Sequence, residues 1–551
     1  MVKNAIEVTI GPPRENFFAV RKFNRLVVRS SVDTTEKGAF SSKLAKKAIL
    51  REFFMMVRIY RLCICLVVLN FSAYLTHAQS SRVVHRDIIL DWNQVMLDAN
   101  ASDCRLVLQD QGGPTRTSRA FAIVSVAMFD ALNSISHHYE PYLTELTGYN
   151  AADETAAVST AARDTLMALF PQQAGRFTSA YSAAMAKVKA GKARSSGIDL
   201  GRRVAAAILA KRSDDNSNLD LPYTPVNLPG YHQPDPLHPD QGFHAPHWGV
   251  VDPFVITDVH SHLSPPPPPL NSPEYAAGYQ QLLDYGGDGI QYPTLRTSHQ
   301  TETGIFWAYD GTPGLGKPPR LYNQIVRTIA IQRWNTVKSN ARLFALVNLA
   351  MADAGIQCWY TKYHYQLWRP VVGIRNGDND TNEFTTGDSN WLPLGAPATN
   401  GGGDGVNFTP PFPAYGSGHA TFGAAAFSVT SRFYGRSDIK FRFTSDEYNG
   451  INRGSDGNIR PVVTRTYHSL DEAILENAIS RIYLGIHWAY DASAGIDAGI
   501  AIADEVYNSA LKPRHPHYGE RQDRTYHPQF VRRTSSPSSS TMRRTGSPSY
   551  R

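Results

Sequence analysis

Apolar residues recur at intervals of three and four along most of the chain between residues 85 and 511, and this period constrains the fold more than any other feature. An α-helix gathers such residues on one face, which must then be buried against another element. Runs that alternate between apolar and polar residues, as half-buried strands do, are scarce. The clearest helical stretches are 118–135, 153–170, 199–212, 318–334, 340–359, 419–435 and 470–510. The sequence therefore predicts an all-α fold with two helix bundles that share one interface.

A long segment without helical periodicity interrupts these stretches. Residues 213–273 are rich in Pro, Asp and His and include the run Pro265–Pro269, which indicates either a long ordered connector or a seam between two helical halves. We place the N-terminal half at 79–264 and the C-terminal half at 265–511. The histidines of this connector are His232, His238, His244, His247, His260 and His262. No two of them have helical ligand spacing and no Cys lies among them, so a metal site there is not favoured.

The basic charge of the chain is confined to its two ends. The 551 residues carry a formal net charge of +7 at pH 7, a balance that often indicates a nucleic-acid partner. Residues 1–78 hold 13 Lys or Arg against 5 Asp or Glu, and residues 512–551 hold 9 against 2. The body between them therefore holds 33 against 41 and is acidic. Because a nucleic-acid-binding protein needs basic residues on its folded surface, we expect no nucleic-acid partner.

The N-terminal region has the pattern of an export signal. Residues 55–78 combine Arg58 and Arg61, a short apolar run and a small-residue cleavage site that ends at Ala78. The apolar run is shorter than the roughly 20 residues that a membrane span needs. We therefore expect a signal peptide and a secreted protein. A membrane anchor formed by the uncleaved segment is the alternative.

The two segments that lie outside the signal peptide and the body, 1–54 and 512–551, are not expected to form part of the folded protein. Residues 1–54 are either a disordered upstream extension or a gene-model artefact, and the basic, Ser- and Pro-rich tail 512–551 is expected to be disordered. The body lacks a set of long apolar runs, so we expect no integral membrane span in the mature protein. Its cysteines, Cys104 and Cys358, allow one disulfide or two buried thiols.

Three segments of the C-terminal half contain the candidate functional residues. The first segment contains two cations. Lys362 and Arg369 are seven residues apart, so a helix that continued to Pro370 would carry both on one face. Two cations on one face repel each other unless an anion lies between them. Their neighbours are aromatic, among them Trp359 and Trp368, which argues against an ordinary solvated face.

The second segment runs from Phe412 to His419 and opens the next apolar helix. Gly416, Ser417 and Gly418 form a small turn at a helix N-terminus, where free backbone N–H groups and the helix dipole attract an anion. Ser417 adds a hydroxyl group, and His419 adds an imidazole that can titrate near neutral pH. A simple helix cap by Ser417 would explain the turn equally well.

The third segment contains Arg481, His487 and Asp491. If 470–510 form one helix, His487 and Asp491 lie one turn apart, so the carboxylate can hold one imidazole nitrogen and orient the other. Arg481, nearly two turns upstream, can reach the same pocket. A lone histidine in an apolar helix is usually a packed core residue, but this one has a carboxylate and an arginine beside it. Together the three segments predict a site for a tetrahedral oxyanion.

These segments resemble a known superfamily, the type 2 acid phosphatases and vanadium-dependent haloperoxidases. Its pattern of K-x6-R-P, P-S-G-H and S-R-x5-H-x3-D is matched at 362–370, 416–419 and 480–491. Further stretches that are similar to the fungal vanadium chloroperoxidases lie at 306–327, 342–356, 394–400, 410–423 and 476–491. The resemblance covers residues 85–512 and implies a secreted, all-helical enzyme with two four-helix bundles and long ordered loops.

The resemblance implies vanadate (orthovanadate) as the cofactor. His487 would be the protein ligand to the metal, through the ring nitrogen that Asp491 does not hold, and His419 would be the acid–base group. Lys362 would also withdraw charge from bound peroxide. The groups implied to hold the vanadate oxygens are Lys362, Arg369, Arg481, the Ser417 hydroxyl and the Gly418 amide.

Other residues have implied roles around that site. Asp310 would pair with Arg481, while Trp359 and Phe412 would line the halide side, Phe412 being the residue type of the chloroperoxidases. The sequence departs from the family at Gly416, where proline is usual. Glycine loosens this turn by up to about 1 kcal/mol of backbone entropy, but the change removes no ligand.

The implied reaction is the oxidation of chloride or bromide by hydrogen peroxide to hypohalous acid, which would then react with small organic acceptors. The alternative is an acid phosphatase in which His487 forms a phosphohistidine and His419 protonates the leaving group. Phosphate and vanadate have the same charge and shape, so the three motifs do not separate the two reactions. The similarity outside the motifs favours the haloperoxidase.

Overall fold

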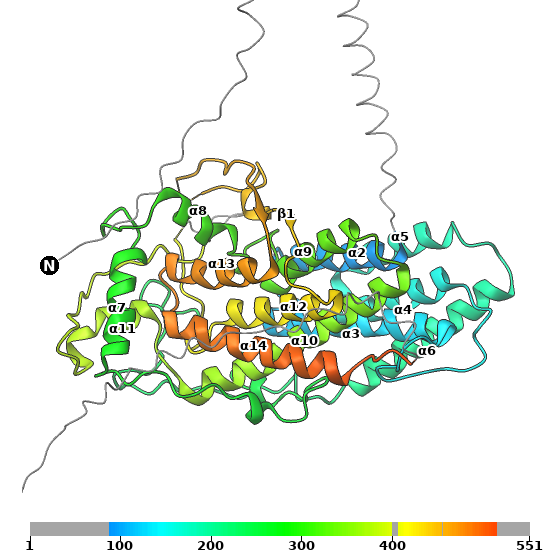
Figure 1. Ribbon diagram of the computed structural model, residues 1–551, viewed down its shortest axis with the longest axis horizontal. Helices are drawn as coiled ribbons and strands as arrows, with labels where there is room; N and C mark the ends of the chain where they lie inside the picture. The colour runs from blue at the N-terminus through cyan, green and yellow to red at the C-terminus, as the bar shows by residue number, and fades with distance from the viewer. Residues whose placement is uncertain (1–86, 399–405, 455, 515–551) are drawn as a thin grey trace, which may run out of the picture. The chain divides into compact units, whose positions relative to one another are not determined.

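The computed structural model describes residues 87–398, 406–454 and 456–514, which all lie in one compact unit within Val84–Arg551 (Figure 1). The α-helices in this part of the chain are α2 (Ile88–Asp103), α3 (Gly113–Ser136), α4 (Glu154–Leu169), α5 (Ala174–Met185), α6 (Lys192–Lys211), α7 (Pro273–Tyr285), α8 (Ser298–Phe306), α9 (Pro318–Gln332), α10 (Val337–Tyr365), α11 (Pro370–Arg375), α12 (Gly418–Tyr434), α13 (Leu470–Tyr483) and α14 (Ala489–Ser509).

Strands are a minor part of the described chain. β1 (Phe441–Thr444) and β2 (Thr464–Tyr467) pair antiparallel, with Phe441 opposite Tyr467. The 3-10 helices are η1 (Pro171–Gln173), η2 (Trp248–Val250), η3 (Val259–His262), η4 (Gly377–Asn379) and η5 (Asp446–Tyr448). The predicted all-α fold is thereby confirmed.

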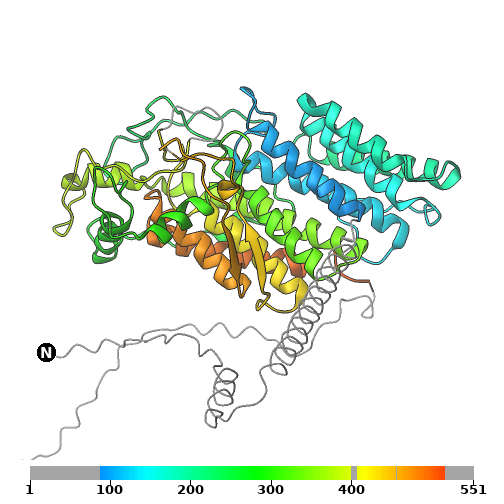
Figure 2. The same cartoon turned by 90° about the horizontal axis from the view of Figure 1, so that it is seen from above.

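Helix α10 is the centre of the fold. Every residue from Asn340 to Trp359 is buried, because α10 packs against α3 on one side and against α12 and α14 on the other. Figure 1 shows α10, α12 and α14 side by side, and in Figure 2 the blue and cyan helices α2 to α6 gather at one end of this group. One hydrophobic core continues from Ile89 in α2 to Val506 in α14. The boundary between residues 264 and 265 stays a prediction.

The predicted helix over 470–510 is wrong in one respect, since two helices occupy this stretch. α13 ends at Tyr483 and α14 begins at Ala489. Gly485, between them, has a φ of 71°, a left-handed conformation that glycine adopts without steric cost. An apolar pattern that continues across a glycine cannot reveal such a break. The pattern also missed α2, which is as long as α4, and the shorter helices α5, α7, α8 and α11.

The Pro- and His-rich connector is ordered and hydrogen-bonded to the core. Between α6 and α7 it contains only the 3-10 helices η2 and η3, and both contact α10. The buried carboxylate of Asp353 in α10 accepts hydrogen bonds from the backbone N–H groups of Phe254, Val255 and Ile256 at 2.6–2.9 Å. Burial raises the pKa of Asp353 to about 6. This carboxylate therefore fixes the connector along the central helix.

The remaining predictions about the body and the ends have mixed outcomes. Cys104 and Cys358 are both buried and both free, so they do not form a disulfide. By length and composition α3 could cross a membrane, but most of its residues are buried inside the protein. The predicted signal segment 55–78 lies outside the described residues, as does the tail beyond residue 514. The backbone carbonyl oxygen of Lys512 accepts a hydrogen bond from the backbone N–H of Glu140. The first residue of the tail that we predicted to be disordered is therefore bonded to the body.

Close contact between α12 and α14 leads to a stability prediction. A Cβ atom at Gly499 would lie 2.4 Å from the carbonyl oxygen of Thr421 and 2.8 Å from the Cβ of Ala424, so Gly499→Ala must push the two helices apart. Overpacking costs about 1–3 kcal/mol, which exceeds the gain of about 1 kcal/mol in helix propensity. We expect a net loss of up to about 2 kcal/mol in the free energy of unfolding, measured by urea denaturation.

The matched control is Gly175→Ala in α5, where an added Cβ would meet nothing within 4 Å. This substitution should leave stability unchanged or raise it. Equal effects of the two substitutions would contradict the close packing of α12 on α14.

Candidate functional site

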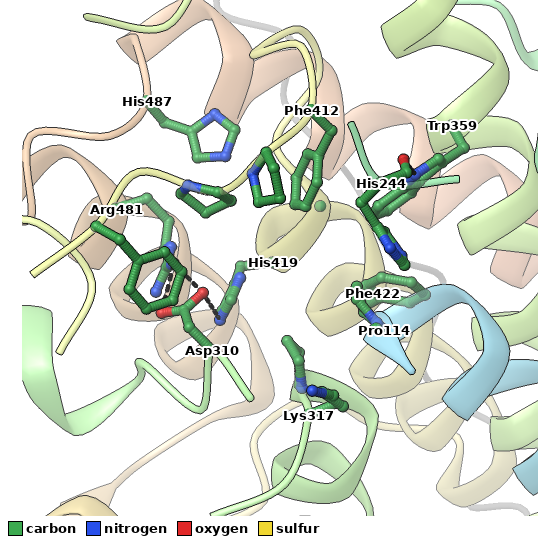
Figure 3. Close-up of a pocket in the computed structure, with 16 residues that line it drawn as sticks. Pro114, His244, Asp310, Lys317, Trp359, Phe412, His419, Phe422, Arg481 and His487 are labelled. Carbon is green, nitrogen blue, oxygen red and sulfur yellow. Dashed lines mark hydrogen bonds and ion pairs between the residues drawn. The ribbon is translucent and has the colours of Figure 1, made fainter. Parts of the chain in front are cut away.

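Seven of the predicted residues line one cavity of about 220 Å³ (Figure 3). Its walls come from segments that are far apart in the sequence, including α10, α12 and α13. The residues that line it are Gly113, Pro114, His244, Asp310, Lys317, Pro318, Trp359, Phe408, Pro410, Pro411, Phe412, Gly418, His419, Phe422, Arg481 and His487. Arg481, His419 and His487, which come from two of the three motifs, therefore share this cavity, while the predicted Lys362, Arg369, Ser417 and Asp491 are not among the residues that line it.

Lys362 lies in the last turn of α10 and is fully buried. Its ammonium group donates to the carbonyl oxygens of Pro413, Ala414 and Gly416 at 2.9, 3.1 and 2.5 Å. All three of its donors are thereby used by the backbone that leads into α12. Burial lowers the pKa of Lys362 to about 7. In this arrangement Lys362 fixes the turn and contributes its charge to the cavity.

Arg369 does not share a helix with Lys362, so the prediction that both cations lie on one helical face is wrong. α10 ends at Tyr365, because Gln366 adopts a left-handed conformation with a φ of 52°. Arg369 is instead the extended N-cap residue of α11, since the residue before a proline avoids the helical region. The two cations nevertheless approach the same turn, because the chain folds back over α10.

The Arg369 guanidinium bridges two segments of the site. Its Nε donates to the carbonyl oxygen of Phe412 at 2.8 Å, and its Nη1 donates to the carbonyl oxygen of Ile486 at 2.8 Å. Nη1 also lies 2.9 Å from His487 Nε2. Burial lowers the pKa of Arg369 to about 9. Nη2 has no hydrogen-bond partner among the described residues.

His487 and Asp491 interact as predicted, although not from one helix. His487 precedes α14 and Asp491 lies in its first turn, with Trp488 as the N-cap residue. His487 Nδ1 is 3.0 Å from Asp491 Oδ2, which also accepts from the backbone N–H of Trp488 at 3.0 Å. A hydrogen on Nδ1, donated to Asp491, leaves the Nε2 lone pair directed toward Arg369. Burial, followed by the charges of Arg369 and Lys362, lowers the pKa of His487, so the ring is neutral.

Arg481 is held by Asp310, as the resemblance implied. Its Nη2 donates to both carboxylate oxygens of Asp310, at 2.7 and 2.9 Å. Both side chains are buried. Nε and Nη1 of Arg481 have no partner in the described chain. Asp310 therefore orients the guanidinium while leaving two of its donor nitrogens available.

The N-terminus of α12 contributes the predicted turn. Ser417 is the N-cap residue, and its hydroxyl group accepts from the backbone N–H of Ala420 at 3.5 Å. The backbone N–H of Ser417 itself donates to the carbonyl oxygen of Asp491 at 2.8 Å, which ties α12 to α14. Gly418 lines the cavity beside Trp359. The cap that we considered as an alternative is thus present at the edge of the cavity.

His419, in the first turn of α12, is also neutral. Its Nε2 lies 2.6 Å from the carbonyl oxygen of Ala308 and 4.0 Å from Asp310 Oδ1. Burial and then the charge of Arg481 lower the pKa of His419 to about 3. Because Nε2 must carry the hydrogen that it donates to Ala308, Nδ1 is the nitrogen able to accept a proton.

Aromatic rings form the other side of the cavity. The rings of Trp359 and Phe412 have centroids 4.8 Å apart. The Nζ of Lys362 lies 5.1 Å from the centre of the Phe412 ring, and the Cζ of Arg369 lies 4.8 Å from it. The two cations are therefore separated from the solvent by an apolar wall.

Several cavity residues were missed in the sequence. His244 belongs to the connector and contacts the rings of Trp359 and Phe412, with centroids 5.9 and 6.1 Å apart. Nothing in the sequence separated it from five other connector histidines, none of which lines the cavity. The described residues contain no group of three His, Cys, Asp or Glu side chains that could hold a metal ion. Lys317, Phe422 and the prolines were missed because no motif includes them.

The unpaired donors define what the site can hold. Arg369 Nη2, Arg481 Nε and Arg481 Nη1 are buried N–H groups without partners in the described protein. An unsatisfied buried donor costs about 1–3 kcal/mol, and more when it is charged. An oxyanion between the two guanidinium groups would satisfy all three, with the His487 ring beside it. The side chains present therefore fit a tetrahedral oxyanion bound next to a neutral, oriented imidazole.

Fold and site together define an all-helical protein with a buried oxyanion site. Residues 342–516 match the family model of the VCPO second helical-bundle domain. The chain is 34% identical over 381 residues to the vanadium chloroperoxidase of Curvularia inaequalis, an alignment that covers 54% of this chain and 61% of that protein. The alignment thus spans less than two thirds of the relative's length.

Solved structures share the fold. A bacterial vanadium-dependent iodoperoxidase matches with a TM-score of 0.62 and 22% identity, over 78% of this chain and 98% of that one. A bacterial vanadium-dependent chloroperoxidase matches with a TM-score of 0.57 and 15% identity, over 74% and 95% of the two chains. The predicted resemblance is confirmed, since the chain is similar in sequence to a vanadium chloroperoxidase and in fold to bacterial vanadium-dependent haloperoxidases.

The burial of Lys362 predicts that anion binding depends on pH. Without an anion, the lowered pKa of about 7 means that the ammonium loses its proton as the pH rises above 7. A bound dianion restores the charge and raises this pKa, so binding takes up a proton. We expect the affinity for tungstate to fall by about tenfold for each pH unit above 7. Isothermal titration calorimetry in two buffers with different ionisation enthalpies measures both the affinity and the proton uptake. An affinity that stays constant from pH 7 to 9 would contradict the low pKa.

Proposed function

We propose that this protein is a vanadate-dependent haloperoxidase that oxidises chloride or bromide with hydrogen peroxide to hypohalous acid. The observation that carries the proposal is the set of three unpaired, buried N–H donors on Arg369 and Arg481, next to a His487 whose Nδ1 is held by Asp491. The likeness to a chloroperoxidase and to the fold of an iodoperoxidase supports the same reaction class.

The residues present suit vanadate. Arg369 and Arg481 would hold its oxygens with their unpaired donors, while the Ser417 hydroxyl and the Gly418 amide would contribute at the helix N-terminus. His487 would bind the metal through Nε2. When bound, vanadate supplies a Lewis acid that activates hydrogen peroxide toward halide without a change in the oxidation state of the metal. Lys362 would add positive charge next to the reacting oxygens and keep the turn before Ser417 fixed.

Proton transfer falls to His419. Because its Nε2 hydrogen is donated to the Ala308 carbonyl, Nδ1 would be the atom that takes a proton from hydrogen peroxide. Trp359 and Phe412 would exclude water on the side where the halide approaches. Hypohalous acid would then react with small organic acceptors. For a chain with the 55–78 signal pattern, we propose secretion, with anchoring by the uncleaved segment as the alternative.

An acid phosphatase remains the second candidate, because the same geometry would serve it. His487 Nε2 would attack phosphorus and release the alcohol, and His419 would protonate the leaving oxygen. One observation disfavours this candidate. The chain is similar over 381 residues to a vanadium chloroperoxidase, and this similarity extends beyond the residues that both reactions would share.

The experiment that tests the proposal compares both activities in one preparation. The protein is stripped of metal, incubated with or without orthovanadate, and assayed for peroxide- and bromide-dependent halogenation of a phenol dye, beside hydrolysis of a phosphate ester. We expect halogenation only after orthovanadate is added, and the ester reaction to be inhibited by it. Ester hydrolysis without vanadate, together with no halogenation, would refute the haloperoxidase and establish the phosphatase.

The role of His487 is tested by vanadate retention. His487→Ala removes the nitrogen that would bind the metal but leaves the arginines in place, so we expect the dissociation constant for vanadate to rise by about 100-fold or more. Equilibrium dialysis with vanadium analysis measures it. His468→Ala, which removes an exposed histidine paired with Glu472, is the control. If His487→Ala retains vanadate as the control does, His487 is not the ligand.

A further inference from the structure

Lys317 lines the cavity as its second cation, besides Arg481, and has no part in the proposed function. The side chain of Lys317 is 7% exposed, and no ion pair joins it to a carboxylate within the described residues. Its hydrogen-bond partners are the side chain of Cys104 and the carbonyl oxygen of Gly311, at 3.4 Å from Nζ, which is a long contact for an ammonium group. A buried ammonium without a close anionic partner is costly to keep.

The local structure directs Lys317 to this position. The residue is the N-cap of α9, and its backbone N–H donates to Asn100 Oδ1 at 3.0 Å. A Cβ at Gly311 would lie 2.3 Å from Lys317 Nζ, and Gly311 has a φ of 91°, so only glycine allows this approach. Gly311 follows Asp310, which holds Arg481. The same loop therefore places one carboxylate against Arg481 and one ammonium at the cavity wall.

The charge of Lys317 reaches the aromatic side of the cavity. Burial and then the charge of Lys317 lower the pKa of His244 to about 3. The His244 ring, which pairs with Thr115 Oγ1 at 3.0 Å, contacts both Trp359 and Phe412. Figure 3 draws Lys317 and His487 on opposite sides of His419. Lys317 is thus a cation of the cavity wall that lies across His419 from the proposed metal ligand His487.

A small monovalent anion has no other cation available in this cavity. The ammonium of Lys362 is bound to three carbonyl groups, and the free donors of Arg369 and Arg481 suit the oxyanion. The rest of the wall is apolar, including Pro114, Pro411 and Phe422. An anion that leaves water for such a wall needs a positive charge to offset the loss of hydration.

We propose that Lys317 forms a second anion site in the cavity, which binds the halide substrate beside Trp359 and Phe412. This inference rests on the proposed function for the identity of the anion as a substrate, but the binding itself is independent of turnover. In the site the ammonium holds the halide at the aromatic wall, and neutral His244 adds no competing charge. Lys317 determines the affinity for halide, whereas vanadate is bound by the residues of the three motifs, among them Arg481 and His487.

The test compares Lys317→Met, which removes the charge at similar length, with Lys317→Arg, which keeps it. Bromide binding is followed by line broadening of the bromide-81 nuclear resonance, in the full chain with and without orthovanadate. We expect Lys317→Met to weaken bromide binding by about tenfold, and Lys317→Arg to restore most of it. In steady-state assays the KM for bromide should rise equally, while the KM for peroxide and vanadate retention stay within about twofold. Lys189→Met, an exposed lysine with the same substitution, is the control.

The outcomes separate this site from the proposed reaction and from a structural role. Bromide broadening that is equal in wild type and Lys317→Met overturns the halide site, whether or not the protein oxidises halide. Loss of vanadate retention in Lys317→Met also overturns it, because Lys317 would then belong to the oxyanion site. If Lys317→Met and Lys317→Arg lose bromide binding and thermal stability together, the lysine only supports the loop. Charge-dependent loss of bromide binding in a protein that does not halogenate would support the anion site and refute the proposed reaction.

Discussion

The site depends on the burial of one ammonium group. Lys362 sits where α10 leaves the core, and it can be accommodated there only because the carbonyl groups of Pro413, Ala414 and Gly416 surround it. Those carbonyls belong to the turn that opens α12, so satisfying the lysine also fixes the helix N-terminus. Arg369 binds the same turn through the Phe412 carbonyl and the other side of the site through Ile486. The backbone around the cavity is therefore rigid before any ligand binds, and an oxyanion would need to order little beyond itself.

The sequence identified which residues meet but misjudged how they meet. Lys362 and Arg369 were predicted on one helical face, and His487 and Asp491 on one helix. In both cases the chain leaves the helix, at Gln366 and at Gly485. Left-handed residues and breaks of a few residues leave no trace in a 3.6-residue pattern. That the three segments meet in one site was still predictable, because cations, a glycine-flanked helix N-terminus and a histidine held by a carboxylate can all bind the same oxyanion.

His244 and Lys317 were beyond the reach of the sequence for a different reason. Both lie in irregular segments that enter the cavity only because distant parts of the protein hold them there. The backbone N–H of His244 donates to the carbonyl oxygen of Pro411, and that of Lys317 donates to Asn100 in α2. Such contacts join residues more than a hundred positions apart, and no periodicity or spacing encodes them. The motifs and the resemblance identified the groups around the oxyanion and the aromatic pair Trp359 and Phe412, whereas His244 and Lys317 reach the cavity through tertiary packing alone.

Burial is the shared cause of the lowered pKa values of the site's cations and histidines. The charges that matter for function are these buried ones, and the net charge of the whole chain does not reveal them. The net charge of +7 comes from the two ends, while the body is acidic. Within that body Lys362, Arg369 and Arg481 are nearly free of water. Burial is the largest cause of the lowered pKa of His487 and of His419; the charges of all three cations add to it at His487, and the charge of Arg481 adds to it at His419. A trivalent or divalent oxyanion reverses each of these shifts at once, since it offsets the desolvation of the cations and their mutual repulsion. Affinity for the oxyanion and protonation of the histidines are therefore one coupled equilibrium. Selectivity between oxyanions of equal charge must come from the bond that His487 Nε2 can form with the central atom.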